Sequence, residues 1–218
     1  MLLRNISVAL VSAALMSACG SPKDANKANF AKAINAELAS SCFSIGGEGF
    51  AEPYPKVIDL NVPREPKYAD EVAKKNAEET APYEALVKVG LLKVEETQDK
   101  TMTMFAKEEL IPAKKYSLTE AGTAALRRPR HDELCAGHYR VDEVVSFTEP
   151  AANMMGQVVS GITYTYSPAD VAPWAKDPAV QAAYPDLVES LKPHQQATKA
   201  AMLQNDGWVA EKQMSIFD

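Results

Sequence analysis

The chain has 218 residues, and its 23 Lys and Arg against 29 Asp and Glu give a formal net charge of −6 at pH 7. Hydrophobic residues make up 46% and charged residues 24% of the sequence, as in an ordinary globular protein. We expect no nucleic-acid partner, because basic residues that neutralise phosphates supply most of that affinity. The length is enough for one large domain or two small ones.

Residues 1–18 have the pattern of a secretory signal peptide. Arg4 makes a positive start, residues 6–16 are almost wholly apolar or small, and Ser17 and Ala18 precede Cys19. The apolar run is about half the roughly 20 residues that a membrane-spanning helix needs. We therefore expect a leader that is cleaved on export.

The stretch LMSACGS resembles the lipobox of bacterial lipoproteins, with Met16 in the place where that family prefers leucine. The resemblance implies that Cys19 receives a diacylglycerol thioether, that cleavage occurs before it, and that its new amino group is acylated. Several acyl chains would hold the protein firmly, whereas one anchors only marginally. Gly20 stands where an aspartate would mark inner-membrane retention, which implies the periplasmic face of the outer membrane. The alternative is an ordinary signal peptide cut after Ala18.

The first predicted element of the mature chain is a helix over residues 24–43. Its apolar residues Phe30, Ile34, Leu38 and Cys42 recur at four-residue spacing and form one stripe. Residues 19–29 are expected to be the lipidated cysteine and a polar tether. The residues expected on the solvated face of the helix are Lys27, Lys32, Asn35 and Glu37.

Residues 56–62 read as a short strand, and residues 67–126 as two helices, three strands and a further helix. The two helices are residues 68–79 and a second one capped by Thr80 with Pro82 in its first turn. The strands are predicted at residues 91–96, 102–105 and 115–118, and Thr119 opens the last helix.

The segments VKVGLLKVEET and KKYSLTEAGTAAL resemble the winged-helix pattern of bacterial transcription regulators. In that family a helix ends in Gly-Leu-Leu, a β-wing follows, and LTEAG starts the next helix. The candidate recognition helix is near neutral in charge, and an exported protein does not meet the chromosome. The resemblance therefore implies a local shape and no binding to DNA.

The last third is rich in β-structure. Residues 137–148 and 157–166 predict strands, and prolines break residues 168–191 into short helical turns. Asn205-Asp206-Gly207 predicts a hairpin between residues 195–203 and 208–213. The expected fold is a single α+β domain over residues 30–218. In it the amino-terminal helix packs on an antiparallel sheet over residues 135–213, with the winged-helix-like part between them.

The cysteine count predicts a disulfide. Once Cys19 is acylated, Cys42 and Cys135 remain, and an exported protein normally pairs an even remainder. A helix that covers the sheet would bring Cys42 close to Cys135, within the ~5.5 Å between α-carbons that a disulfide needs. The alternative is two separately buried thiols.

Three other groups of side chains have to be weighed. His131, Cys135 and His138 have a spacing that could ligate zinc, or could activate Cys135 as a nucleophile, but we expect no metal, no cofactor and no catalytic residue. The basic cluster is Arg127, Arg128 and Arg130. Charges at the end of a helix suit its dipole, and contact with an anionic envelope polymer or lipid is the alternative.

The aromatic residues Tyr164, Tyr166, Trp174 and Trp208 either line a ligand groove or pack the sheet against a helix. Taken together, the pattern resembles small envelope lipoproteins of bacteria, which implies no particular activity. We expect a lipid-anchored, non-enzymatic binding or structural module whose partners are the membrane and an envelope protein or ligand. An envelope hydrolase or thiol enzyme is the alternative.

Overall fold

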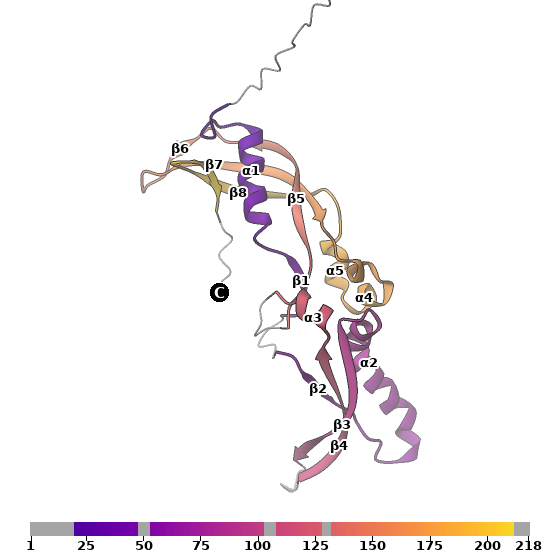
Figure 1. Ribbon diagram of the computed structural model, residues 1–218. Helices are drawn as coiled ribbons and strands as arrows, with labels where there is room; N and C mark the ends of the chain where they lie inside the picture. The colour runs from indigo at the N-terminus through magenta and orange to yellow at the C-terminus, as the bar shows by residue number, and fades with distance from the viewer. Residues whose placement is uncertain (1–19, 48–52, 103–107, 128–131, 212–218) are drawn as a thin grey trace, which may run out of the picture.

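The computed structural model describes residues 20–47, 53–102, 108–127 and 132–211 of the chain. Cys19, Arg128, Arg130 and His131 lie outside these residues. The fold is α+β, as the sequence predicts, with two antiparallel sheets at the two ends of an elongated molecule and helices packed on both (Figure 1). No helix among the described residues is long and apolar enough to cross a membrane.

The larger sheet has the strand order β1-β5-β7-β8-β9, with the short β6 beside β7. The turn between β8 and β9 is made by Asn205 and Asp206, and Gly207 follows with a φ of 138°. This confirms the predicted hairpin and the antiparallel sheet. The strands are β1 (Phe43–Ile45), β5 (Leu134–Phe147), β6 (Ala151–Ala152), β7 (Val158–Ala169), β8 (Gln195–Gln204) and β9 (Gly207–Ala210).

The first helix, α1 (Lys27–Leu38), covers one face of this sheet (Figure 1). Phe30 and Ile34 are fully buried, which confirms the predicted stripe. The prediction that the helix continues to residue 43 is wrong. The hydroxyls of Ser40 and Ser41 donate to the carbonyls of Glu37 and Leu38, so side chains satisfy groups that a further helical turn would have satisfied.

The second sheet has the order β2-β4-β3 and lies beside one long helix, α2 (Ala69–Lys88). The predicted break at Thr80 is wrong. The hydroxyl of Thr80 donates to the carbonyl of Asn76 inside the helix, and Pro82 is accommodated one turn before the buried Leu86. The remaining elements are β2 (Lys56–Asp59), η1 (Pro66–Tyr68), β3 (Leu92–Met102), β4 (Glu108–Leu118) and α3 (Glu120–Ala125).

The middle part of the chain is an insertion between two strands that pair with each other. In β1 and β5, Ser44 pairs with Cys135, so residues 46–133 leave the larger sheet and return to it at the same place. Three short helices, η2 (Pro173–Lys176), α4 (Pro178–Ala183) and α5 (Pro185–Ser190), lie at this junction (Figure 1). The hydroxyl of Tyr184 donates to the carbonyl of Pro82 at 3.4 Å, which joins them to α2.

Candidate functional site

A groove of about 780 Å³ lies where the carboxyl end of α1 meets the larger sheet. Tyrosines 139, 164 and 166 line it from β5 and β7, and we call it the tyrosine groove. The other lining residues come from α1 and the segment after it, from β8, and from the residue that follows β9. They are Glu37, Leu38, Ser41, Cys42, Ala197, Thr198, Lys199, Ala200 and Glu211.

The three tyrosine rings pack against one another. The ring centroids of Tyr139 and Tyr166 are 4.9 Å apart in an edge-on arrangement, and those of Tyr164 and Tyr166 are 5.7 Å apart. Contacts of this kind hold aromatic rings in place beyond what burial alone does. These contacts therefore hold the partly exposed rings of Tyr139 and Tyr166 in place along the groove, with the almost fully buried Tyr164 packed against Tyr166.

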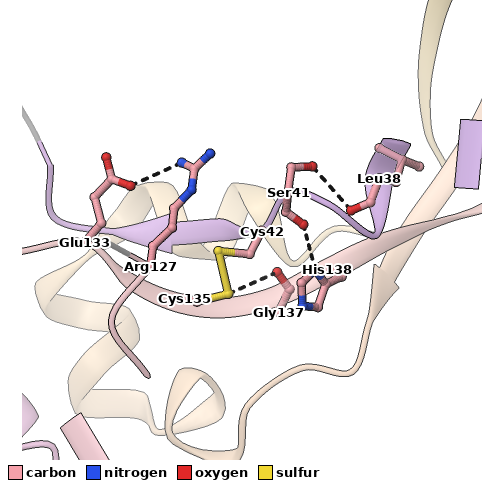
Figure 2. Close-up of a disulfide and its surroundings, with 8 residues drawn as sticks. All are labelled: Leu38, Ser41, Cys42, Arg127, Glu133, Cys135, Gly137 and His138. Atoms are coloured by element: carbon pink, nitrogen blue, oxygen red, sulfur yellow. Dashed lines mark hydrogen bonds and ion pairs between the residues drawn. A yellow bond between two sulfur atoms is a disulfide. The ribbon is translucent and has the colours of Figure 1, made fainter. Parts of the chain in front are cut away.

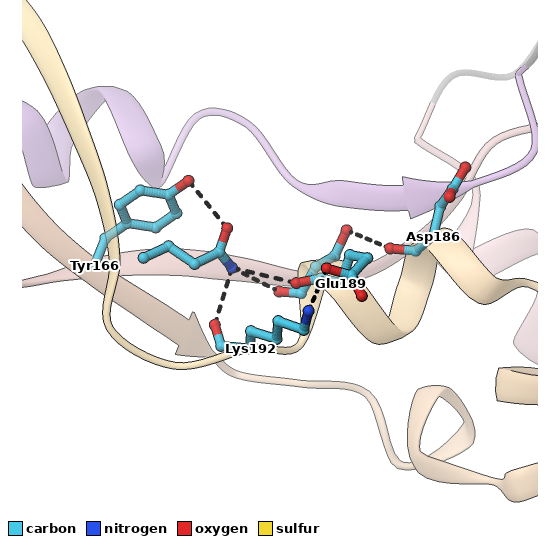
Figure 3. Close-up of polar contacts among 6 residues, drawn as sticks. Tyr166, Asp186, Glu189 and Lys192 are labelled. Atoms are coloured by element: carbon cyan, nitrogen blue, oxygen red, sulfur yellow. Dashed lines mark hydrogen bonds and ion pairs between the residues drawn. The ribbon is translucent and has the colours of Figure 1, made fainter.

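A hydrogen-bonded chain fixes Tyr166 from the side of α5. Its hydroxyl donates to Oε1 of Gln195 at 3.2 Å, and Nε2 of Gln195 donates to the carbonyl of Lys192 at 2.9 Å (Figure 3). The hydroxyl of Tyr139 donates to the carbonyl of Ser190 at 3.2 Å. Two of the three tyrosines are thus tied to the carboxyl end of the same short helix.

An ion pair borders the groove on the other side. Nζ of Lys199 lies 2.6 Å from Oε2 of Glu37, and both side chains are only about 14% and 13% exposed. Burial, then the charge of Glu37 and then Tyr166 raise the pKa of Tyr164 to about 12, so its hydroxyl stays neutral at ordinary pH. The expectation that Glu37 lies on a solvated face is wrong, since Lys199 of β8 comes over it.

The aromatic residues singled out in the sequence divide between the two readings. Tyr166 lines the groove, whereas Tyr164 borders it but is only 3% exposed and belongs to the core under α1. Trp208 lies in the same core, with its ring 4.8 Å from that of Phe30. Trp174 packs against the core at the junction. No sequence pattern pointed to Tyr139 beyond its place in a predicted strand, because only the pairing of β5 with β7 brings it beside Tyr166.

Cys42 and Cys135 form a disulfide, as predicted, with their α-carbons 5.8 Å apart (Figure 2). Cys42 lies just before β1 rather than on α1, and Cys135 lies in β5. In this oxidised form Cys135 offers no thiolate as a nucleophile or metal ligand. Nδ1 of His138 lies 2.6 Å from the carbonyl oxygen of Ser41, which places an N–H on that nitrogen. Among the described residues no three His, Cys, Asp or Glu side chains group as a metal site.

Arg127, the described member of the basic cluster, is paired locally. Its guanidinium lies 3.2 Å from Oε2 of Glu133 (Figure 2). The adjacent Asp132 pairs with Lys56 at 2.9 Å and accepts a hydrogen bond from the backbone of Gly47. These contacts hold the end of the insertion against β2 and the loop after β1.

Ser167, Asp142 and His194 lie together but in the wrong order for nucleophilic catalysis. Oγ of Ser167 donates to Oδ2 of Asp142 at 2.6 Å, and Nδ1 of His194 lies 3.2 Å from the same oxygen. A serine nucleophile passes its proton to histidine, which the carboxylate orients from behind. Here the carboxylate lies between the two, and the cluster fastens the start of β8 to β5 and β7.

A second groove, of about 840 Å³, runs along α2 and is lined mainly by alanines. The charged side chains Glu84 and Lys114 in this groove are already hydrogen-bonded. Glu84 accepts from Nζ of Lys114 at 2.6 Å and from the hydroxyl of Tyr116 at 2.8 Å. These hydrogen bonds, with that from Lys114 first, lower the pKa of Glu84. They fasten α2 to β4 and leave an apolar, shallow surface.

No known protein family matches the chain, and neither the curated proteins nor the solved structures include a significant match to it.

Proposed function

We propose that this chain is a lipid-anchored protein of the cell envelope that binds a ligand in the tyrosine groove, and that it acts as a binding module rather than as an enzyme. Its anchor is the acylated Cys19, on the periplasmic face of the outer membrane. The observation that carries the binding role is the fixed surface of Tyr139 and Tyr166 beside the buried pair of Glu37 and Lys199.

The groove has the general character of a ligand site. Such sites are concave and mostly apolar, with aromatic walls and a few polar groups at fixed positions. Tyrosine supplies an apolar ring and a polar tip, and rings that are already packed lose little freedom when a ligand binds. We infer a ligand with an apolar body and polar substituents, presented by another component of the envelope.

The support for the anchor is in the sequence. The leader ends in LMSACGS, whose resemblance to a lipobox assigns the acyl chains to Cys19. A cysteine left free at the start of an exported chain would be reactive, whereas an acylated one is protected and useful. Several acyl chains would keep the protein on one membrane.

Photo-crosslinking in intact cells tests the binding role. A photoreactive amino acid at Glu211, an exposed residue that lines the groove, is expected to give an adduct with one envelope component. The matched control is Gln196, which is exposed on β8. Gln196 is not among the residues that line the groove, although Ala197 beside it is.

The substitution Tyr166→Ala tests whether the adduct forms with a ligand bound in the groove. We expect the adduct at Glu211 to fall several-fold in this variant, because the ring that walls the groove is removed. Equal adducts at Glu211 and Gln196, or an adduct that Tyr166→Ala leaves unchanged, would contradict a ligand in the tyrosine groove.

A further inference from the structure

Two adjacent methionines, Met154 and Met155, form the tip of the turn between β6 and β7. With relative exposures of 107% and 80%, they are the most exposed large hydrophobic residues in the described part of the chain. We propose that this turn inserts into the interfacial layer of the bilayer that anchors the protein. The inference rests on the proposed lipid anchor and adds a second contact with the same membrane.

The hydrogen bonds that shape the turn do not involve the methionine side chains. Oδ1 of Asn153 accepts from the backbone N–H groups of Met155 and Gln157, each at 3.0 Å, and Nδ2 of Asn153 donates to Oε1 of Gln157 at 3.1 Å. Gly156 supplies the positive φ of 75° that closes the turn. A shape held by these polar contacts leaves both methionine side chains directed outward.

The stretch around the tip is free of charge. From Pro150 to Ala169 the sequence contains no Asp, Glu, Lys or Arg. Moving charged groups out of water is strongly unfavourable, and even neutral polar groups resist it unless they are hydrogen-bonded. The side chains of Asn153 and Gln157 are already bonded to each other and to the turn. The tip can therefore move from water into the bilayer without burying a charged side chain.

The amino-terminal segment holds this end of the molecule close to the proposed anchor. Nε1 of Trp208 donates to the carbonyls of Lys23 at 3.1 Å and Asp24 at 3.2 Å, and Nδ2 of Asn29 donates to the carbonyl of Ser21 at 2.8 Å. The segment expected to be a tether is thus hydrogen-bonded to the domain from Ser21 onward. Ser21 is two positions after Cys19, so at most ~7 Å of chain separates the acylated residue from the first residue bonded to the domain.

The turn lies at the same end of the molecule as this segment, and the β3–β4 hairpin lies at the other (Figure 1). A convex tip with two long, flexible apolar side chains suits a deformable acyl layer better than a shaped protein surface. The lipid surface is therefore the partner that the geometry favours.

Quenching by brominated lipid tests the insertion in the full, lipidated protein. The protein is reconstituted in vesicles of phosphatidylethanolamine and phosphatidylglycerol, with or without bromine on the acyl chains. The test variant is Met155→Trp and the control is Leu110→Trp, because Leu110 is 58% exposed on the β3–β4 hairpin at the far end. Both variants share the background emission of Trp174 and Trp208.

We expect bromine to quench the added emission at position 155 several-fold more than that at position 110. Flotation of the unsubstituted protein with the vesicles reports the anchor separately. If the protein floats and the two positions are quenched equally, the insertion is refuted and the anchor stands. If the protein does not float, the anchor and the insertion both fail.

Discussion

Cys42 and Cys135 are 93 residues apart in the chain, yet their disulfide lies at a single point, the neck of the inserted middle part. Cys42 directly precedes β1, and Cys135 is in the strand that pairs with β1. The whole of β2, α2, β3, β4 and α3 therefore lies within the loop that the disulfide closes. The bond holds together the two chain segments that leave and re-enter the larger sheet.

Replacement of both cysteines, Cys42→Ser with Cys135→Ser, should lower the free energy of unfolding substantially. Closing a loop of 93 residues removes chain entropy from the unfolded state worth about 4–5 kcal/mol, an upper range because native contacts can adjust. Denaturant unfolding under non-reducing conditions measures the loss.

Added reductant provides the control for this prediction. It should destabilise the natural protein by a similar amount and leave the double variant unchanged. A reductant effect of equal size in both proteins would show that the disulfide is not the source of the difference.

The substitution Phe30→Ala should cost about 3–5 kcal/mol, because Phe30 is fully buried and its ring lies 4.8 Å from the rings of both Phe147 and Trp208. The matched control is Lys32→Ala on the exposed side of the same helix, which should change stability by less than about 0.5 kcal/mol. Thermal or denaturant unfolding compares the two. Similar losses for both would mean that α1 does not cover the core as described.

Much of this fold could be predicted from local patterns. The four-residue repeat of Phe30, Ile34 and Leu38 marks the buried face of a helix, and Asn205-Asp206-Gly207 allows few conformations other than a turn. The expected export and the cysteine count predicted the pairing of Cys42 with Cys135. The helix stripe and the turn are each read from a few neighbouring residues, and the disulfide from the number of cysteines in the whole chain.

What the sequence did not predict depends on local side-chain hydrogen bonds at one helix end and on contacts between distant segments. The end of α1 is decided by the hydroxyls of Ser40 and Ser41, and a terminus of this kind is uncertain from a pattern alone. The tyrosine groove needs the pairing of β5 with β7, and the burial of Glu37 needs Lys199 from β8. Neither contact can be predicted from the residues of one segment alone.

The raised pKa of Tyr164 predicts a loss of stability at alkaline pH. Its pKa is about 12 in the folded protein against 10.0 for the ordinary side chain, so the folded state keeps the proton longer than the unfolded state does. The contribution is complete below pH 10 and is lost as the pH rises toward 12. Tyr164→Phe has no proton to lose, and between these values its stability should fall by about 1–2 kcal/mol less than that of the natural protein.

Denaturant unfolding across this alkaline range tests the difference between the two proteins. All other groups are the same in the two proteins, so the difference between their stabilities measures the effect of Tyr164 alone. The variant Glu37→Gln should make the loss smaller, because the charge of Glu37 is the second cause of the shift. Parallel pH curves for the natural protein and Tyr164→Phe would rule out the buried, neutral hydroxyl described here.

The most direct test of the proposed role is the mass of the amino-terminal tryptic peptide of the protein extracted from its own envelope with detergent. We predict a peptide of residues 19–23 that begins at Cys19 and carries a diacylglyceryl group on sulfur and an acyl group on nitrogen. Cys19→Ser should leave an uncleaved precursor or release unacylated protein. A mature chain that begins elsewhere, or an unmodified Cys19, would contradict the lipid anchor.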